Sequence, residues 1–245
     1  MNAPSKEVVN VLCMKWGTKY AADYVNTLYS MVARNLSREF RFVCLTEDAK
    51  SLDSRIEVFP LPEIAVNLDG PERGWNKLAV FSETLYDLKG KVLCLDLDLI
   101  ITGSLDDLFD CPGEVMIIKD WIKKDGTGNS SVYRFEVGAH PEILAEFEQS
   151  FEQIKQTHRN EQEYLSATLM KKNALVYWPD SWCRSFKRHC IKPFSLFVAR
   201  ETEMPEDTRV LVFHGKPDPH DAVAGVSGKW YRRFKPATWV AEHWH

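Results

Sequence analysis

Apolar residues in the first half of the chain occur either in short continuous runs or at positions spaced three or four apart. The continuous runs predict buried strands at residues 8–14, 40–45, 56–59 and 91–95. The spaced positions predict a helix over residues 74–86, which Gly90 ends, and an earlier helix with one apolar face formed by Tyr20, Tyr24, Leu28, Met31 and Val32. This order of elements predicts an α/β fold with a mostly parallel central sheet flanked by helices, whose ligands bind outside the carboxyl ends of the strands.

The second half of the chain has shorter elements. Ser104 is predicted to cap a short helix. Strands are predicted at residues 115–119, 131–137, 175–178 and 210–213, and helices at residues 141–154 and 161–170. Because no internal repeat or low-complexity linker divides the sequence, we expect one domain over residues 1–245.

Two carboxylates interrupt the apolar run K-V-L-C-L-D-L-D-L-I-I-T of residues 91–102. Side chains alternate along a strand, so Asp96 and Asp98 lie on the same side of the backbone, where they repel each other unless a positive group lies between them. An isolated D-x-D usually marks a strand end whose carboxylates are solvated or cap the next turn. Here the chain becomes apolar again after Asp98, which favours a bound cation as the alternative explanation.

Composition narrows the classes of partner. A formal net charge of -4 lacks the positive field that nucleic acids require, so we expect no nucleic-acid partner. The first residues have too short an apolar core for a signal peptide, and no run is long enough to span a bilayer, which predicts a cytoplasmic protein. The six cysteines include no C-x-x-C pair, which favours reduced and mostly buried thiols.

Two classes of enzyme use a D-x-D after a strand. In haloacid-dehalogenase-like phosphatases the first Asp is a nucleophile, but that motif lies on the first strand and needs a later G-D-x-x-x-D, which this sequence lacks. In GT-A glycosyltransferases the D-x-D lies mid-chain and binds a divalent ion that bridges the donor diphosphate. The placement here fits the second class. A phosphohydrolase with Asp96 as nucleophile and an inactive nucleotide- or glycan-binding domain remain the alternatives.

Four motifs resemble glycosyltransferase family 8, the glycogenin-like and lipopolysaccharide-galactosyltransferase-like GT-A enzymes. They are V-L-C-M-K-W-G-T-K-Y at residues 11–20, the D-x-D region of residues 86–109, N-E-Q-E at residues 160–163 and H-G-K-P at residues 214–217. The last has two residues fewer than the family's H-x-G-x-x-K-P. The resemblance implies a nucleotide-binding half over about residues 1–110 and an acceptor half over about residues 111–245.

The D-x-D and H-G-K-P motifs both follow predicted strands. Two carboxylates and an imidazole form a mixed oxygen and nitrogen site suited to manganese, so we expect Asp96, Asp98 and His214 to hold Mn²⁺ or Mg²⁺. Gly215 permits close approach of the backbone, and Lys216 is expected to hold the departing phosphate.

The resemblance implies roles for further residues at the donor site. Lys15, Trp16, Gly17 and Tyr20 would contact the uracil and ribose. Glu161 would bind the donor sugar, with Gln162 beneath its anomeric carbon, although an acidic residue is also ordinary at a helix start. Lys77 would reach the sugar or diphosphate, or only extend its charge to solvent. Asn129 would contact the sugar, or only form a turn.

These expectations describe a metal-dependent transferase with a nucleotide-sugar donor, UDP-sugar above others, that retains configuration. The acceptor is expected to be a glycan or lipid-linked glycan, contacted by Trp178, Trp182 and the basic segment of residues 184–189. The aromatic and basic residues 229–245 suit either peripheral contact with the inner face of a membrane or packing against the domain's own core, with packing slightly favoured.

Overall fold

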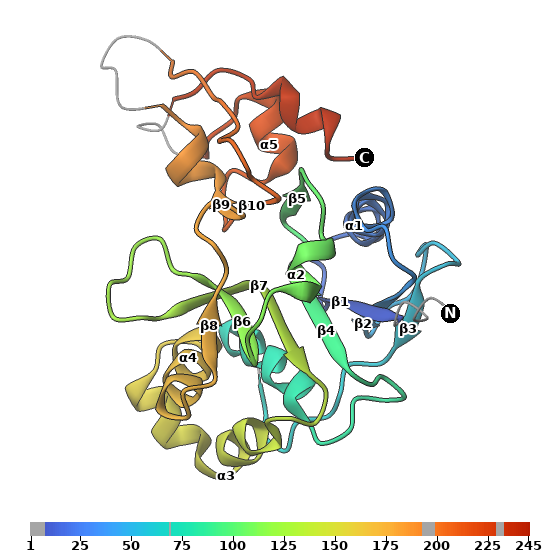
Figure 1. Ribbon diagram of the computed structural model, residues 1–245, viewed down its shortest axis with the longest axis vertical. Helices are drawn as coiled ribbons and strands as arrows, with labels where there is room; N and C mark the ends of the chain where they lie inside the picture. Colours follow the sequence, from blue (N-terminus) through green and yellow to red (C-terminus); the bar gives the residue numbers. More distant parts are fainter. Residues whose placement is uncertain (1–7, 69, 193–198, 229–232) are drawn as a thin grey trace, which may run out of the picture.

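The computed structural model describes residues 8–68, 70–192, 199–228 and 233–245 (Figure 1). Its first half follows the predicted order. The elements are β1 (Val9–Lys15), α1 (Ala22–Asn35), β2 (Phe40–Thr46), β3 (Glu57–Phe59), η1 (Gly70–Phe81) and β4 (Lys91–Leu95). The predicted helix over residues 74–86 is wrong in its bounds and type, because η1 is a 3-10 helix that begins and ends earlier.

The second half adds the strands and helices that complete the fold. They are β5 (Leu99–Ile101), α2 (Asp106–Asp110), β6 (Val115–Lys119), β7 (Gly128–Glu136), α3 (Pro141–Thr157), α4 (Glu161–Lys171), β8 (Leu175–Tyr177), β9 (Cys183–Ser185), η2 (Phe186–Cys190), β10 (Val210–Val212), α5 (Pro219–Ala224) and η3 (Thr238–Glu242). The N-cap of α2 is Leu105 rather than the predicted Ser104, although the Ser104 Oγ accepts from the Asp106 amide at 3.1 Å. The sequence pattern did not indicate β9, η2 or α5.

The described strands form two sheets. The larger has the order β3-β2-β1-β4-β7-β6-β8, in which β7 pairs antiparallel with both neighbours and the other pairs are parallel. This confirms the predicted α/β fold with a mostly parallel sheet. The smaller sheet has the order β5-β10-β9. In Figure 1, α3 and α4 lie at one end of the molecule, α5 lies toward the other, and β5, β9 and β10 lie between α5 and the large sheet.

The D-x-D stretch lies where the chain passes from the large sheet to the small one. The Asp96 amide donates to the Ser131 carbonyl at 2.9 Å, which extends the pairing of β4 with β7. The Phe213 amide donates to the Asp98 carbonyl at 2.8 Å, which extends the pairing of β5 with β10. The apolar run of residues 91–102 is therefore two strands in two sheets, and the aspartates occupy the junction.

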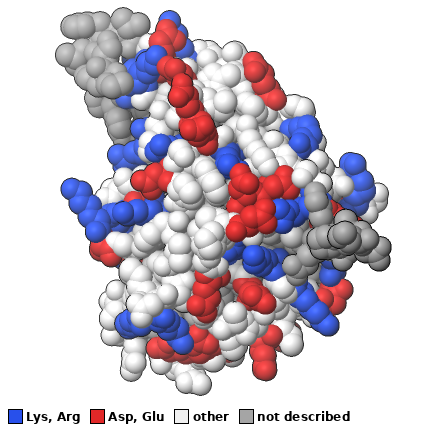
Figure 2. Space-filling view, in the orientation of Figure 1, with Lys and Arg blue, Asp and Glu red and all other residues white. Residues whose placement is uncertain are grey.

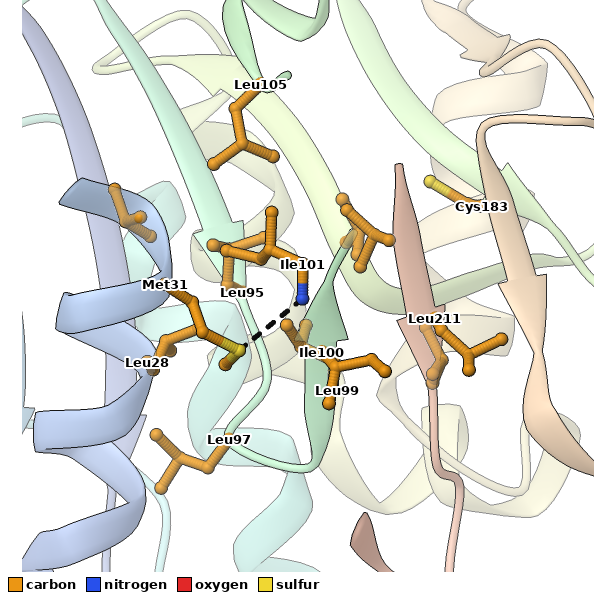
Figure 3. Close-up of a cluster of buried hydrophobic side chains, with 14 of the residues drawn as sticks. Leu28, Met31, Leu95, Leu97, Leu99, Ile100, Ile101, Leu105, Cys183 and Leu211 are labelled. Carbon is orange, nitrogen blue, oxygen red and sulfur yellow. Dashed lines mark hydrogen bonds between the residues drawn. The ribbon is translucent and has the colours of Figure 1, made fainter. Parts of the chain in front are cut away.

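An apolar cluster holds this junction against α1 (Figure 3). Leu97, between the two aspartates, is 3% exposed and packs in the same cluster as Leu28 and Met31 of α1. The Ile101 amide on β5 contacts the Met31 Sδ at 3.5 Å. The chain bends at Leu97 and Asp98, where Leu97 is buried in this cluster and Asp96 stays half-buried.

The remaining expectations about the core are met in the described residues. All six cysteines are free, and all except the half-buried Cys111 are buried. Phe234 is buried, and Trp239 and Trp244 pack against the core, as the packing explanation predicts. Trp230 and Tyr231 lie outside the described residues. No described helix is long and apolar enough to cross a bilayer.

Charged side chains cover the surface in mixed sign. On the face shown in Figure 2, Lys and Arg are interspersed with Asp and Glu, so no broad field of one sign covers it.

Arg134 is an exception to this surface distribution, because it lies in the core at 1% exposure. Its guanidinium donates to four backbone carbonyls, those of Leu108, Phe109, Cys111 and Gly113, at 2.6 to 3.1 Å. It thereby fixes the end of α2, and the chain that follows, to β7.

Replacing this guanidinium should destabilise the fold strongly. We expect Arg134→Met to lower the free energy of unfolding by about 3 kcal/mol or more, because several buried carbonyls lose their donor. Urea denaturation measures the change. The control is Arg159→Met, whose side chain is 77% exposed and pairs with Glu163, and a change within about 1 kcal/mol is expected there. Equal effects of the two substitutions would contradict the structural role given to Arg134.

Candidate functional site

One cleft of about 340 Å³ brings together residues from distant parts of the sequence. It lies beside the junction between the two sheets, with contributions from η1, β7 and the start of α4. Of the residues predicted from the sequence, those that line it are Lys77, Asp96, Asp98, Asn129, Glu161, Gln162, His214 and Gly215. The structure therefore gathers three of the four motifs, D-x-D, N-E-Q-E and H-G-K-P, around one cleft.

The two aspartates of the junction have different environments. Asp98 is 9% exposed, and its Oδ2 accepts from the Tyr20 hydroxyl at 2.7 Å. Burial, reinforced by the charge of Asp96, raises the pKa of Asp98 to about 6. Asp96 instead accepts from the Lys77 ammonium at 2.5 Å. One carboxylate is thus held by a neutral donor and the other by a cation.

Lys77 comes from η1 and lies among acidic groups. Burial lowers the pKa of Lys77, but attraction to Asp96, then to Glu161, outweighs it, so the pKa is raised above the ordinary value. The ammonium therefore stays charged at neutral pH. It faces the cleft, which favours the predicted role over extension to solvent.

The start of α4 forms part of the wall of the cleft. The Asn160 Oδ1 caps the helix by accepting from the Glu163 amide at 3.1 Å. Glu161 and Gln162 then meet the start of β7, where the Glu161 Oε1 accepts from the Ser130 hydroxyl at 3.0 Å and the Gln162 Oε1 accepts from the Ser130 amide at 3.4 Å. Glu161 is therefore both a residue of the first helical turn and a wall of the cleft. Asn129 lies within β7 rather than in the turn that its sequence context suggested.

His214 follows β10, as the position of H-G-K-P predicts. Its Nε2 lies 2.7 Å from the Ser185 Oγ, and its ring stacks on Trp121 with centroids 5.5 Å apart. Gly215 has a φ of +69°, a conformation that glycine adopts without strain. Asp120 and Trp121 also line the cleft. The sequence did not indicate these two residues, because they lie in the connection between β6 and β7, which has no periodic pattern.

The lining of the cleft carries more negative than positive charge. Asp96, Asp98, Asp120 and Glu161 oppose Lys77. A phosphate-bearing ligand would meet net repulsion there unless a cation accompanied it. Asp96 and Asp98 supply the oxygen donors that a divalent cation prefers, so the residues present fit such an ion. Among the described residues, no three acidic, histidine or cysteine side chains already converge as a metal cluster.

The remaining predicted donor residues line two further pockets beside the cleft. Trp16 and Tyr20 share a pocket of about 170 Å³ with Lys77, Asp96 and Asp98. Lys15, Gly17 and Tyr20 line another of about 500 Å³ with residues after β2. Gly17 has a φ of +59°, and its amide donates to the Glu47 Oε1 at 2.7 Å. Tyr20 thus connects both pockets to the aspartate junction.

Lys216 lies apart from these residues. Its side chain is 61% exposed and forms ion pairs of 2.7 Å with Asp218 and Asp221. Those two carboxylates form the capping box of α5. The described residues lining the cleft do not include Lys216, whereas Lys187 donates to the His214 carbonyl.

Solved structures show what this arrangement is similar to, although no family model and no curated protein matches the sequence. The galactosyltransferase LgtC, solved with donor and acceptor sugar analogs, has a TM-score of 0.60 at 15% identity over 86% of this chain and 89% of its own. The glycosyltransferase GlyE of Streptococcus pneumoniae TIGR4 has a TM-score of 0.60 at 14% identity over 96% of this chain and 60% of its own. Mouse xyloside xylosyltransferase 1 has a TM-score of 0.52 at 13% identity over 73% of this chain and 88% of its own.

The chain has the GT-A fold. This confirms the resemblance to GT-A glycosyltransferases that the four motifs indicated. At these identities the likeness establishes the fold, and the site must be argued from its own residues. In this GT-A chain the cleft lies beside the D-x-D junction, at the carboxyl end of β4.

The ion pair of Lys77 with Asp96 should contribute to stability. We expect Lys77→Met to lower the free energy of unfolding by about 1 to 3 kcal/mol at pH 7.5 in a chelator, because the cleft carboxylates lose their nearest cation. The loss should shrink at about pH 5, because Asp98, whose pKa is raised to about 6, has by then largely lost the charge that Lys77 offsets. Urea denaturation at the two pH values measures it. The control is Lys171→Met, at an exposed position of α4. An unchanged stability in Lys77→Met would mean that the ion pair does not hold the site.

Proposed function

We propose that this chain is a metal-dependent glycosyltransferase that moves a sugar from a nucleoside-diphosphate sugar, a UDP-sugar above others, to a glycan or lipid-linked glycan. The observation that carries the proposal is the convergence of Asp96 and Asp98 with Glu161, Gln162 and His214 on one cleft in a GT-A fold. The solved LgtC structure with donor and acceptor sugar analogs supports the same assignment of donor and acceptor.

A divalent ion, Mn²⁺ or Mg²⁺, would be held by Asp96 and Asp98, with His214 on the same cleft as the third candidate ligand. When bound, it would neutralise charge on the diphosphate. The excess of carboxylates over cations in the cleft supports this requirement. The Tyr20 hydroxyl orients Asp98, and Lys77 orients Asp96 and adds positive charge near the phosphates.

The sugar is assigned to the wall formed by α4 and β7. When the bond between the anomeric carbon and the diphosphate oxygen breaks, positive charge develops on the sugar ring and negative charge on the leaving group. Glu161 and the Gln162 amide oxygen would stabilise the ring charge, with Asn129 and Ser130 binding the sugar hydroxyls. The acceptor oxygen then bonds to the anomeric carbon, and its proton passes to the leaving phosphate, so no separate base is needed.

Lys216 could hold the departing phosphate only after its present ion pairs are exchanged. Its ammonium is committed to Asp218 and Asp221 in the structure, so holding the phosphate would require exchange of those ion pairs. Lys187 donates to the carbonyl of His214, a residue that lines the cleft. We assign the leaving phosphate to Lys77 and Lys187 first and to Lys216 second.

Nucleotide binding tests the donor class. At a hundred times its dissociation constant, UDP with Mn²⁺ should stabilise the protein by about 2.7 kcal/mol, which raises the melting temperature by about 5 to 10 °C. Thermal-shift titrations compare UDP, GDP and CMP with and without Mn²⁺. The shift should disappear in Asp98→Asn and persist in Asp207→Asn, a matched change at an exposed aspartate. Absence of a shift with every nucleotide would remove the proposal, and release of phosphate from simple esters would favour a phosphohydrolase.

The anomeric outcome tests retention. With an α-configured UDP-sugar, slow hydrolysis without acceptor should first release the α-sugar, because water attacks on the face that the diphosphate leaves. Proton NMR of the anomeric signal follows the product before it mutarotates. First release of the β-sugar would show inversion and would overturn the role given to Gln162, while leaving glycosyl transfer intact.

A further inference from the structure

A second pocket of about 250 Å³ opens beside the donor cleft. Asp120 and Trp121 line both, so a molecule in the second pocket would reach the donor cleft past these two residues. The Trp121 indole is fixed at this wall, since its Nε1 donates to the Cys183 carbonyl at 3.3 Å and its ring stacks on His214. The second pocket is therefore placed where an acceptor would meet the donor sugar.

Arg184 of β9 lines this second pocket and has an unsatisfied donor. Its Nε is buried and has no hydrogen-bond partner in the structure. No carboxylate among the described residues pairs with its guanidinium, whereas Arg38, Arg41 and Arg209 each form ion pairs. Leaving a buried donor of a charged group unmet is costly, and a guanidinium presents a planar fork that matches a carboxylate or phosphate. Arg184 therefore has the chemistry of a binding group for an anion.

The other polar groups of the pocket are less suited than Arg184 to bind an anion. The Ser185 amide donates to the His189 Nδ1 at 2.9 Å, so that nitrogen carries a lone pair. Burial, with repulsion from Arg184, lowers the pKa of His189, which keeps its ring neutral at pH 7. The Asp120 Oδ1 already accepts from the amides of Ile122 and Lys123, both at 2.8 Å. The exposed side chains Lys119 and Asp180 lie at the rim with opposite charges.

We infer that this pocket holds the acceptor and that Arg184 selects acceptor sugars that carry an anionic substituent, a carboxylate or a phosphate. The inference rests on the proposed glycosyl transfer, since it names the acceptor class for that reaction. Arg184 is then a specificity-determining residue that touches the acceptor at a distance from the reacting oxygen. Trp121 and the buried Trp178 supply the apolar wall that a pyranose ring needs beside the charge.

Direct binding tests the inference without a donor. Ligand-observed NMR compares methyl glucoside, methyl glucuronide, glucose 6-phosphate and inorganic phosphate on the wild type. The two anionic sugars should bind about tenfold to a hundredfold more tightly than methyl glucoside, as expected for a charge-assisted pair. The glucuronide and the sugar phosphate distinguish the two sources of charge. No preference for an anionic sugar, or inorganic phosphate binding as tightly as the sugar phosphate, would overturn the inference.

Two substitutions locate the effect. Arg184→Gln should abolish the preference for anionic sugars, and Arg184→Lys, which keeps the charge without the planar fork, should retain part of it. The control Arg55→Gln alters an arginine whose side chain is 67% exposed and pairs with Asp53, and it should keep the full preference. If Arg184→Gln still prefers anionic sugars, the preference comes from a residue other than Arg184. If Arg184→Gln does not fold, loss of part of the preference in Arg184→Lys carries the test.

Turnover separates this inference from the proposed function. In Arg184→Gln the KM for an anionic acceptor should rise by about tenfold or more, while kcat for donor hydrolysis without acceptor stays unchanged. If no nucleotide binds but anionic sugars bind in a manner that depends on Arg184, the sugar site is supported and the proposed transferase function is contradicted. Normal donor hydrolysis together with an acceptor KM that Arg184→Gln does not change would support the proposed transferase and overturn the role given to Arg184.

Discussion

The site depends on the backbone hydrogen bonds that carry the chain from the large sheet to the small one. The Asp96 amide continues the pairing of β4 with β7, and the Asp98 carbonyl continues the pairing of β5 with β10. Leu97 lies between them in the core beside α1. With both ends of the stretch paired and Leu97 buried, the chain bends at Leu97 and Asp98, and both carboxylates line the cleft. The direction of the D-x-D motif therefore follows from packing, before any ligand is considered.

Placing these carboxylates at a sheet junction has an energetic cost that neighbouring elements offset. The folded pKa of Asp98, about 6, lies above its ordinary value of 3.8, so ionising it between those pH values costs the folded state more than the unfolded state. The Tyr20 hydroxyl before α1 and the Lys77 ammonium from η1 reduce this cost. These contacts join two segments, the one before α1 and η1, to the junction. The site is thus kept at a charge imbalance that a bound cation would relieve, which is the usual compromise between stability and function.

The sequence predicted what depends on local pattern. Strand ends located Asp96, Asp98 and His214, because that signal lies within a few residues of each motif, whereas Glu161 and Gln162 came from the resemblance of N-E-Q-E to the family motif. It failed where placement depends on distant partners. β9 is three residues long and exists through its pairing with β10, and Lys216 is drawn from the cleft by the capping carboxylates of α5. The strand β7 begins at Gly128, three residues before the predicted start at residue 131, and the polar residues Asn129 and Ser130 of this added part line the cleft.

The two sheets divide the work of the molecule. The large sheet, with η1 and α4, supplies Lys77, Asn129, Glu161 and Gln162 to the donor cleft. The small sheet supplies Arg184 from β9, and its strand β10 ends at His214. Trp121 joins them, because it lies in the connection between β6 and β7 of the large sheet, donates to the Cys183 carbonyl of β9 and stacks on the His214 ring after β10. A substitution on the outward side chains of β9 can therefore change which acceptor binds, while the backbone pairing that orients the aspartates stays intact.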